Sequence, residues 1–269
     1  FDTRQALILR DRFDSVEGLS GWNNDDVLTG AARLLAGEGF VDTLTQAGVD
    51  RIDGLRELLG VVDSGSPNDV VFESDVNGGG EIILGGAGSD TIRGNLGNDY
   101  LDGDAWLHVR ISVNESTDRT GAEIATFETL TSQITWTNTM PPSWQALDSS
   151  GLPTGLTRSL AELMRTGEIN PGQLQAVREI LNSDGSLVAD TGASTNLTGD
   201  TDIAVFSDVR ANYDIETDNL GNIGDGDGDG FIRVQHNGPG GGGGGGGNRL
   251  DDGIDLIRNF ELLQFSDGI

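Results

Sequence analysis

The stretch that decides the fold is Gly85-Gly86-Ala87-Gly88-Ser89-Asp90-Thr91-Ile92-Arg93, followed directly by Gly94-Asn95-Leu96-Gly97-Asn98-Asp99-Tyr100-Leu101-Asp102. The first nine residues match the repeat pattern GGxGxDxUx, in which U is a large aliphatic residue, at every fixed position. The next nine match except that Asn95 replaces the second glycine. The preceding nine, residues 76–84, keep only Gly79, Glu81 and Ile83 at positions four, six and eight. Repetition in strict register makes this a strong signal, whereas one nonapeptide alone would be weak.

The nine-residue spacing predicts a short parallel β-roll. Six residues form a tight loop and three form a short strand, so each nonapeptide makes half a turn. Glycines supply the backbone positions with positive φ. The aliphatic residue at position eight points inward and builds a narrow core. Loops on the same side of the roll are therefore expected two repeats apart.

These loops carry the hard oxygen ligands that calcium requires, since Ca²⁺ takes six to eight oxygens from carbonyls and carboxylates. We expect the loop containing Asp99 to share an ion with the loop at Gly79 and Glu81, and the loop containing Asp90 to share one with Gly103-Asp104. The Gly103-Asp104 loop departs quickly from the pattern, so one or two well-formed sites are predicted. The alternative is a glycine-rich loop without metal. The predicted ligand positions are Gly79, Glu81, Gly86, Gly88, Asp90, Asn95, Gly97, Asp99, Gly103 and Asp104.

A second acidic motif, in which Asp225, Asp227 and Asp229 alternate with glycines, fits the first half of an EF-hand loop. The bidentate Glu that closes such a loop is missing, since position twelve is His236. A β-hairpin turn without metal is therefore an equal alternative to a calcium site. Three carboxylates at alternating positions repel one another without a cation, and this repulsion supports the calcium site as an alternative. Residues 24–30 look like a decayed copy of the nonapeptide, and no metal is expected there.

The charge balance excludes several partners. The chain has 44 acidic residues against 16 basic ones, all of them Arg, for a formal net charge of −28. Nucleic acid and anionic lipid both need a cationic surface, so neither is expected as a partner. Divalent cations would relieve the self-repulsion of such a chain, and a halophilic or very soluble surface is the alternative. Cys is absent, which rules out disulfides, and no apolar run reaches the length of a membrane span.

The rest of the chain predicts a mainly β protein with a few helices, in which the short roll is embedded in a larger β-rich domain. Helices are expected at 44–59, at 156–165, and from Asn170-Pro171 to 181. Strands are expected at 106–113, 201–206, 211–217, 230–235 and 255–265. The predicted segments are 1–66 with mixed strand and helix, 67–113 with the roll, 114–199 with loop and two helices, and 200–269 with strands, the Asp/Gly turn and a glycine-rich loop.

No catalytic constellation is visible, so we expect a protein that is not an enzyme. His108 and His236 are the only histidines, which nearly excludes a zinc site of two or three histidines. Thiol catalysis is impossible without Cys, and the motifs H-E-x-x-H and G-x-S-x-G are missing. Carboxylate pairs are too abundant to be informative, and His108 in a strand is expected to be structural.

Several stretches outside the two repeats are informative: VEGLSGW at 16–22, DDVLTG at 25–30, residues 82–112, INPGQL at 169–174, VREIL at 177–181, DIAVFS at 202–207 and RANY at 210–213. Together they resemble the C-terminal calcium-binding region of large secreted bacterial haem peroxidases of the animal type. The ending, residues 255–268, is similar to the terminal strands of RTX exoproteins, which are hemolysin-type calcium-binding proteins. In that family the haem pocket lies upstream. The resemblance therefore implies calcium and type I export from a Gram-negative bacterium, but no peroxidase activity for this chain.

Three functions follow as hypotheses. The leading one is a secreted module that is folded and stabilised by extracellular Ca²⁺, whose extracellular sites bind at about 10⁻⁴–10⁻³ M. The second is a structural subunit of a calcium-dependent extracellular fibre, sheath or surface layer that self-assembles through strand edges. The third is the non-catalytic C-terminal tail of a secreted haem peroxidase.

Overall fold

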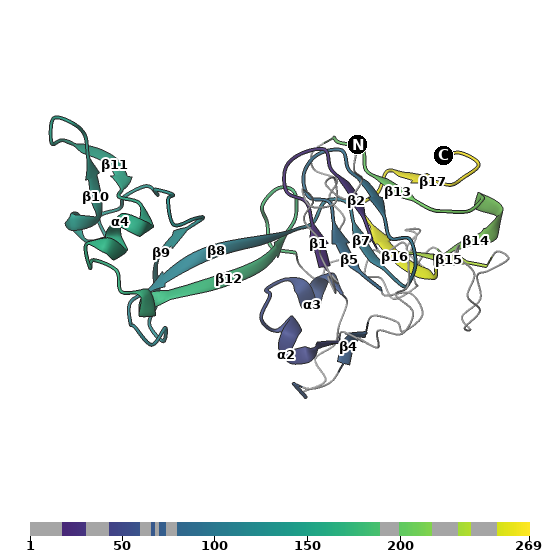
Figure 1. The fold of residues 1–269 in the computed structure, drawn as a ribbon, viewed down its shortest axis with the longest axis horizontal. Helices are drawn as coiled ribbons and strands as arrows, with labels where there is room; N and C mark the ends of the chain where they lie inside the picture. Colours follow the sequence, from purple (N-terminus) through teal and green to yellow (C-terminus); the bar gives the residue numbers. More distant parts are fainter. Residues whose placement is uncertain are drawn as a thin grey trace, which may run out of the picture. The chain divides into compact units, whose positions relative to one another are not determined.

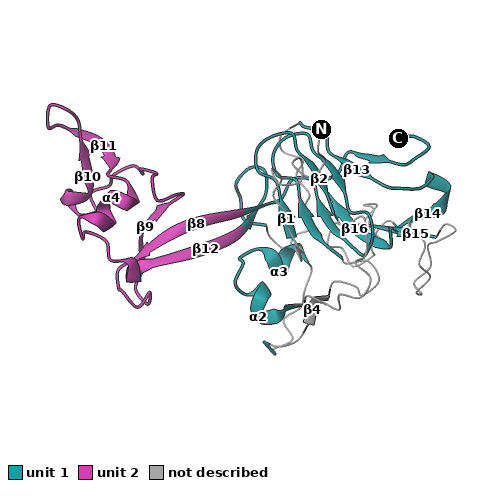
Figure 2. Cartoon of the chain, in the orientation of Figure 1, with its two compact units in different colours: residues 1–107, 180–269 teal, residues 108–179 magenta. Residues whose placement is uncertain are grey.

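The computed structural model describes residues 18–30, 43–59, 66–67, 70–73, 80–188, 199–216, 231–237 and 252–269. The described chain is mainly β with a few short helices, as predicted (Figure 1). It divides into two compact units, unit 1 with residues 1–107 and 180–269 and unit 2 with residues 108–179 (Figure 2). These units differ from the four segments expected from the sequence, because strands of the N-terminal, repeat and C-terminal segments pair with one another.

Unit 1 is built on short strands that alternate between two sheets. In the first sheet the parallel neighbours are, in order, β1 (Gly18–Ser20), β5 (Ile82–Leu84), β7 (Tyr100–Asp102) and β16 (Ile254–Arg258). In the second they are β2 (Val27–Thr29), β6 (Thr91–Arg93), β13 (Ile203–Val205) and β17 (Leu262–Gln264). We call these eight strands and the turns between them the winding. Successive nonapeptides place their strands in opposite sheets, and β5 pairs with β7 two repeats on, as the spacing predicted.

The core of the winding lies between its two sheets. Position eight of the repeats points inward, as predicted, and Ile83, Ile92 and Leu101 are at most 1% exposed. Leu28, Ala204 and Ile257 lie opposite them on neighbouring strands and belong to the same apolar cluster. Burial of these aliphatic side chains against each other is the main apolar contribution to the stability of so narrow a core.

A first insertion separates β2 from β5 and holds β3 (Thr43–Thr45), α2 (Gln46–Val49), α3 (Leu55–Leu58) and β4 (Val70–Glu73). The single helix expected over 44–59 is therefore wrong. Leu44 lies in a strand paired with β4. Gly54 adopts a positive φ of 83° just before α3 and separates the two helical turns. Val49, Leu55 and Leu58 still form an apolar face, which packs with Leu84 of the winding.

The insertion between β13 and β16 extends the first sheet. It contains β14 (Tyr213–Glu216) and β15 (Ile232–His236), which run antiparallel to each other and continue the sheet beyond β16. The strands expected at 201–206, 211–217 and 230–235 are confirmed to within a few residues. The strand or strand pair expected at 255–265 consists of β16 and β17, which lie in different sheets.

Unit 2 has its own sheet and its own core. β8 (Trp106–Asn114), which confirms the predicted strand, lies between β9 (Glu123–Phe127) and β12 (Leu174–Leu181). A hairpin of β10 (Gln145–Leu147) and β11 (Pro153–Thr157) and the helix α4 (Leu160–Arg165) complete it. The core includes Val113, Phe127, Trp144, Leu160 and Leu163.

Of the two helices expected between 114 and 199, one is shorter than predicted and one is wrong. α4 forms only the second half of 156–165, since residues up to Thr157 pair with β10. Asn170 does cap a turn with Pro171 at its first position, but this turn is a single 3₁₀ turn that ends at Gln173. The residues that follow form β12 because a partner strand, β8, is available to pair with them. Tertiary pairing here overrides a helical spacing of apolar residues.

Candidate metal centre

An acidic residue stands at the start of most strands of the winding. On one side, Asp26, Asp90, Asp202 and Glu261 directly precede β2, β6, β13 and β17. Because these strands are neighbours in register, their four acidic residues form a column across successive turns. We call this column one.

The opposite side of the winding repeats the arrangement. Glu81 precedes β5 and Asp99 precedes β7, and the register of β16 on β7 places Asp255 next to Asp99. We call these three residues column two. The amide of Glu81 donates to Oδ1 of Asp99 at 2.8 Å, and the amide of Asp99 donates to Oδ1 of Asp255 at 3.1 Å.

Column one has the same ladder of hydrogen bonds. The amide of Asp26 donates to Oδ1 of Asp90 at 2.7 Å, and the amide of Asp90 donates to Oδ1 of Asp202 at 2.7 Å. The amide of Asp202 donates to Oε2 of Glu261 at 2.6 Å. One oxygen of each accepting carboxylate is thereby fixed to the turn before it, which leaves the second oxygen in a defined position.

The second oxygens are buried without a protein donor. Oδ2 of Asp90, of Asp99 and of Asp202 accepts no hydrogen bond from any residue that the structure describes. All three residues are at most 1% exposed. A buried carboxylate oxygen without a donor or counter-ion is costly. These atoms therefore fit a bound cation.

At three glycines of the winding, a backbone carbonyl oxygen and a carboxylate Oδ2 both lie close to where a Cβ would be. A Cβ at Gly85 would lie 2.3 Å from the carbonyl oxygen of Gly103 and 2.5 Å from Oδ2 of Asp90. A Cβ at Gly103 would lie 2.1 Å from the carbonyl oxygen of Asn259 and 2.6 Å from Oδ2 of Asp202. The first turn repeats the arrangement, with Gly21 between the carbonyl of Gly85 and Oδ2 of Asp26. Each glycine thus leaves a small space lined by a carbonyl and a carboxylate oxygen.

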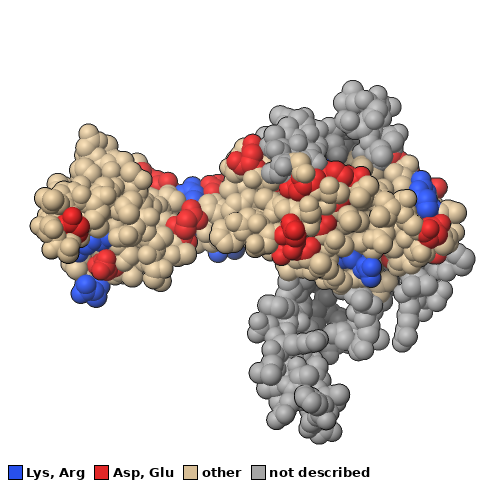
Figure 3. All heavy atoms as spheres, turned by 90° about the horizontal axis from the view of Figure 1, so that it is seen from above, with Lys and Arg blue, Asp and Glu red and all other residues tan. Residues whose placement is uncertain are grey.

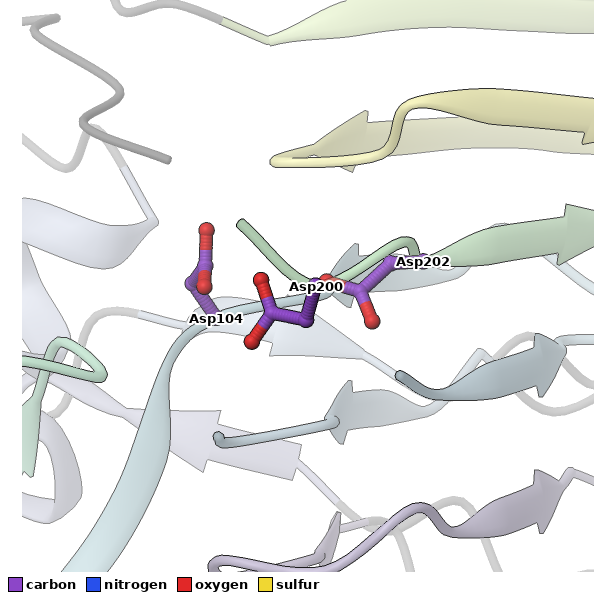
Figure 4. A group of neighbouring side chains, drawn as sticks. All are labelled: Asp104, Asp200 and Asp202. Atoms are coloured by element: carbon purple, nitrogen blue, oxygen red, sulfur yellow. The ribbon is translucent and has the colours of Figure 1, made fainter. Parts of the chain in front are cut away.

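Two further carboxylates, those of Asp104 and Asp200, converge on Asp202 of column one at the two ends of the insertion between β7 and β13. One oxygen of each of these three residues lies within 4.8 Å of the others. Figure 4 shows the three side chains close together. Asp104 and Asp202 are each 1% exposed. Oδ2 of Asp200 accepts the amide of Gly88 at 3.2 Å, and its Oδ1 is buried with no hydrogen-bond partner among the described residues. We call these three residues the triad. Its ligands are oxygens alone, which suits a hard cation such as Ca²⁺ or Mg²⁺.

Burial makes these carboxyl groups hard to ionise in the absence of a cation. It raises the pKa of Asp99 to about 6, of Asp104 to about 7 and of Asp202 to about 8. Burial likewise raises the pKa of Asp90, and the carboxylates of Asp26 and Asp200 raise it further. A bound cation would favour the ionised forms and reverse these shifts.

Two of the predicted loop neighbours lie side by side in the structure. Asp99 accepts a hydrogen bond from the amide of Glu81, and Asp90 lies beside Gly103 across Gly85. The carbonyl of Gly97 is approached from the following turn, since a Cβ at Gly253 would lie 1.9 Å from it. The predicted residues Gly79, Asp225, Asp227 and Asp229 lie outside the described residues, and their role as ligands stays a prediction.

The repeat loops have the backbone conformation that the pattern requires. Gly86, Gly88 and Gly97 have φ of 103°, 126° and 122°. Asn95, which replaces a glycine, adopts a φ of 73° and donates its side-chain amide to the carbonyl of Gly30 at 2.9 Å. Asn is among the few residues that tolerate this region, which explains why the second repeat retains the fold without its second glycine.

Sequence reasoning missed four acidic residues of the columns and the triad: Asp200, Asp202, Asp255 and Glu261. It also placed no metal at residues 24–30, where Asp26 heads column one. A signal was present, since Asp202-Ile203-Ala204 and Asp255-Leu256-Ile257 repeat the acid, any residue, apolar order of Asp90-Thr91-Ile92. Insertions interrupt the nine-residue period at these places and hide it.

Comparison of the chain with protein-family models, with curated proteins and with solved structures returned no match. In the part of the chain that the structure describes, no helix is long and apolar enough to cross a membrane.

Proposed function

We propose that this chain is a secreted calcium-binding module whose winding folds when extracellular Ca²⁺ enters between its turns. The observation that carries the proposal is the pair of acidic columns. In these columns Asp90, Asp99 and Asp202 have one oxygen fixed by an amide, and the other is buried with no donor among the residues that the structure describes.

The donor set favours calcium over magnesium. Carboxylate and carbonyl oxygens line the spaces at Gly21, Gly85 and Gly103. Such sites suit Ca²⁺, which accepts six to eight oxygens in flexible geometry, whereas Mg²⁺ demands near-ideal octahedral geometry and usually keeps several waters. The net charge of −28 adds a general attraction for divalent cations. Acidic side chains are spread widely over the face drawn in Figure 3, with fewer basic ones among them.

The resemblance to RTX exoproteins supports a role outside the cell. Cytosolic calcium would be too low to fill weak sites, and millimolar external calcium would fill them after export. Millimolar calcium is about 1–10 times the Kd of such extracellular sites, so each ion adds about 0.4–1.4 kcal/mol to the free energy of unfolding. The structure is thus expected to form after export rather than before it.

Circular dichroism in calcium and in EGTA tests the proposal. We expect the β signal to fall in EGTA and to return when calcium is added. Asp90→Asn should shift the calcium midpoint to higher concentration, because it removes a charged ligand from the winding. The matched control is Asp118→Asn, which changes an exposed acid of unit 2 whose partners are Ser116 and Thr120. An unchanged signal and melting temperature in EGTA would refute the proposal.

A structural role in a calcium-dependent assembly is a second candidate, favoured by the first turn of the winding. β1 and β2 are the edge strands of their sheets in the part of the chain described. Leu19, Trp22 and Val27 are 39%, 59% and 79% exposed there. A second copy of the chain could add to these edges. Sedimentation in calcium checks this, with Val27→Lys expected to disperse any assembly, and a monomer at all protein concentrations would dismiss the idea.

A further inference from the structure

We infer that the triad of Asp104, Asp200 and Asp202 is the tightest cation site in the described chain, and that its ion holds together the two ends of the insertion that contains unit 2. The inference rests on the proposed function, because it assigns one ion of the winding a distinct place and task. Neither the triad's composition nor its position follows from the nonapeptide pattern, to which only Asp104 was assigned.

The triad joins two parts of the chain that are remote in sequence. Asp104 follows the end of β7, where the chain leaves the winding, and Asp200 precedes β13, where the chain enters it again. Unit 2, residues 108–179, lies between them in sequence. In Figure 4 the three side chains come from the two segments where the chain leaves and re-enters the winding, and they approach one another. An ion bound here therefore closes a long chain loop.

A buried ion pair fixes the backbone at residues 103–105, where the chain leaves the winding after β7. Arg258 donates to Oδ2 of Asp102 at 2.7 and 2.9 Å, and Oδ1 of Asp102 accepts the amides of Asp104 and Ala105 at 3.0 Å each. The amide of Gly86 donates to the carbonyl of Gly103 at 2.9 Å. The backbone that carries Asp104 is thus positioned by the repeats and by β16.

Residues 200–203, where the chain enters the winding again before β13, are hydrogen-bonded to the first nonapeptide. The amide of Ile203 donates to the carbonyl of Asp90 at 2.8 Å, and Oδ2 of Asp200 accepts the amide of Gly88 at 3.2 Å. Asp104 and Asp202 both direct buried oxygens that accept no hydrogen bond from the described residues into the gap between the two segments. The two ends of the insertion are therefore brought to a common point where three carboxylates lie close together, with the side chain of Ser183 beside Asp104.

Without a cation, repulsion between their carboxylates would push apart the two segments where the chain leaves and re-enters the winding. The charged neighbours that act most strongly on Asp104 are Asp102, Asp200 and Glu261, and those that act most strongly on Asp202 are Asp90, Asp104 and Glu261. Arg258, which could have compensated, is paired with Asp102. Repulsion between like charges in a buried place is relieved by a cation of high charge.

The number of carboxylates makes this site tighter than the others. The spaces at Gly21 and Gly85 each offer one carboxylate oxygen and one carbonyl oxygen, whereas the triad offers three carboxylates. Affinity for a hard cation rises with the charge of its ligands and with the rigidity of the site. A trivalent lanthanide should therefore displace calcium from the triad before it displaces calcium elsewhere.

Terbium luminescence in the whole, calcium-loaded chain reads this site selectively. Trp106 follows Asp104 by two residues, so their Cα atoms are at most about 7.6 Å apart. Excitation of tryptophan should then sensitise the first equivalent of Tb³⁺. The ring of Trp22 lies 6.3 Å from that of Trp106, so Trp106→Phe combined with Trp22→Phe should remove most of this signal. Trp136→Phe, in unit 2, should leave it unchanged.

The decisive variant is Asp104→Asn combined with Asp200→Asn. We expect loss of the first-equivalent luminescence and a weakening of the tightest calcium site by more than about tenfold, since even indirect partners of a metal ligand are worth about 10–100-fold. At limiting calcium, hydrogen exchange should rise in residues 103–107 and 199–206 but not in 108–179. Asp99→Asn, in column two on the opposite side of the winding, is the matched control and should keep the luminescence.

The outcomes separate this inference from the proposed function. If the double variant keeps the luminescence, affinity and exchange of the parent chain while EGTA still unfolds the winding, the triad inference alone is wrong. If EGTA has no effect on the parent chain, the proposed function is wrong. Should the Asp104→Asn/Asp200→Asn variant fail to fold in calcium, the Tb³⁺ measurements on the folded chain with Trp22→Phe and Trp106→Phe still decide, because a first equivalent that neither Trp22 nor Trp106 sensitises is bound elsewhere.

Discussion

The two units treat acidic side chains in opposite ways. In unit 2, Glu179 and Glu123 both pair with Arg110, at 3.0 and 2.8 Å, and Glu168 pairs with Arg158 at 3.6 Å. In the two columns of the winding of unit 1, acidic residues stack on acidic residues. The buried carboxylates of Asp90 and Asp202 each accept an amide through Oδ1, and their Oδ2 accepts no hydrogen bond from the described residues. Outside the columns, Asp102 of the winding pairs with Arg258.

If the proposed function holds, this difference predicts which acidic residues need an external cation. Where the chain provides its own arginines, folding neutralises the acids and no ion has to be supplied. Where it provides only backbone amides, one oxygen of each buried carboxylate has no hydrogen-bond donor. A cation from solution would then offset the free-energy cost of burying that charge. Calcium dependence should therefore be confined to unit 1.

Removal of calcium should have the largest effect and should divide the molecule along this line. The chain has four tryptophans, of which Trp22 and Trp106 belong to unit 1 and Trp136 and Trp144 to unit 2. In EGTA the indole NMR signals of the first pair should move to unfolded positions, while those of the second pair stay dispersed. Signals that all move together, or all stay, would show that the two units do not differ in this respect.

Filling one glycine space should come next in size. Gly85→Ala places a Cβ 2.3 Å from a backbone carbonyl and 2.5 Å from Oδ2 of Asp90, so backbone or ligand must shift. We expect a loss of about 3 kcal/mol or more in the free energy of unfolding, together with weaker calcium binding. Gly151→Ala is the control in unit 2, since no atom lies within 4 Å of its Cβ and only its φ of 78° is strained. It should cost about 1–2 kcal/mol and leave calcium binding unchanged in a calorimetric titration.

The unbroken part of the repeat could be predicted in detail. Between residues 82 and 102 the spacing gave the alternation of strands between sheets, the inward aliphatics and the loop partnerships of Asp90 and Asp99. All of these depend on local geometry, in which each turn places the next. The predictions remained correct for as long as the period was continuous.

The rest could not be predicted, because it depends on chain segments that return from insertions. Asp202 occupies the same position as Asp90 one turn on, yet residues 103–200 separate it from the repeats, and no spacing rule spans such a gap. The order acid, any residue, aliphatic is too short to identify such a turn alone. The helix predicted over the residues of β12 is wrong for a related reason. Their apolar spacing suits a helix, and only pairing with β8 makes them a strand.

A change of pH without calcium should move the two units in opposite directions. Burial raises the pKa of Asp104 to about 7 and of Asp202 to about 8, so the folded winding holds protons that the unfolded chain releases. Its stability should therefore fall as pH rises toward 8 and recover on acidification. In unit 2, hydrogen bonds from Arg110 lower the pKa of Glu179, so the stability that this pair contributes is present at neutral pH and lost on acidification below the usual value of 4.5.

The same four indole signals, followed in protein freed of calcium by a chelating resin, check this pH dependence. Trp22 and Trp106 should regain dispersion between pH 8 and pH 5, and Trp136 and Trp144 should lose it only below about pH 4.5, the ordinary Glu range. Equal slopes for the two pairs of signals would contradict the contrast drawn between the units.

The smallest effect should come from breaking the internal pairing of unit 2. The Arg110 guanidinium donates to Glu179 through Nε and Nη2, each at 3.0 Å, and to Glu123 through Nη1 at 2.8 Å, with its side chain 20% exposed. Arg110→Gln should cost about 1–2 kcal/mol, because charged hydrogen bonds are lost from a partly solvated site. Urea unfolding followed at Trp144 measures it, and the loss should be the same with and without calcium. A loss that calcium repairs would mean that Glu123 and Glu179, once freed, bind the ion as the acids of the winding do, and that the absence of arginine is what makes a carboxylate cluster of this chain a calcium site.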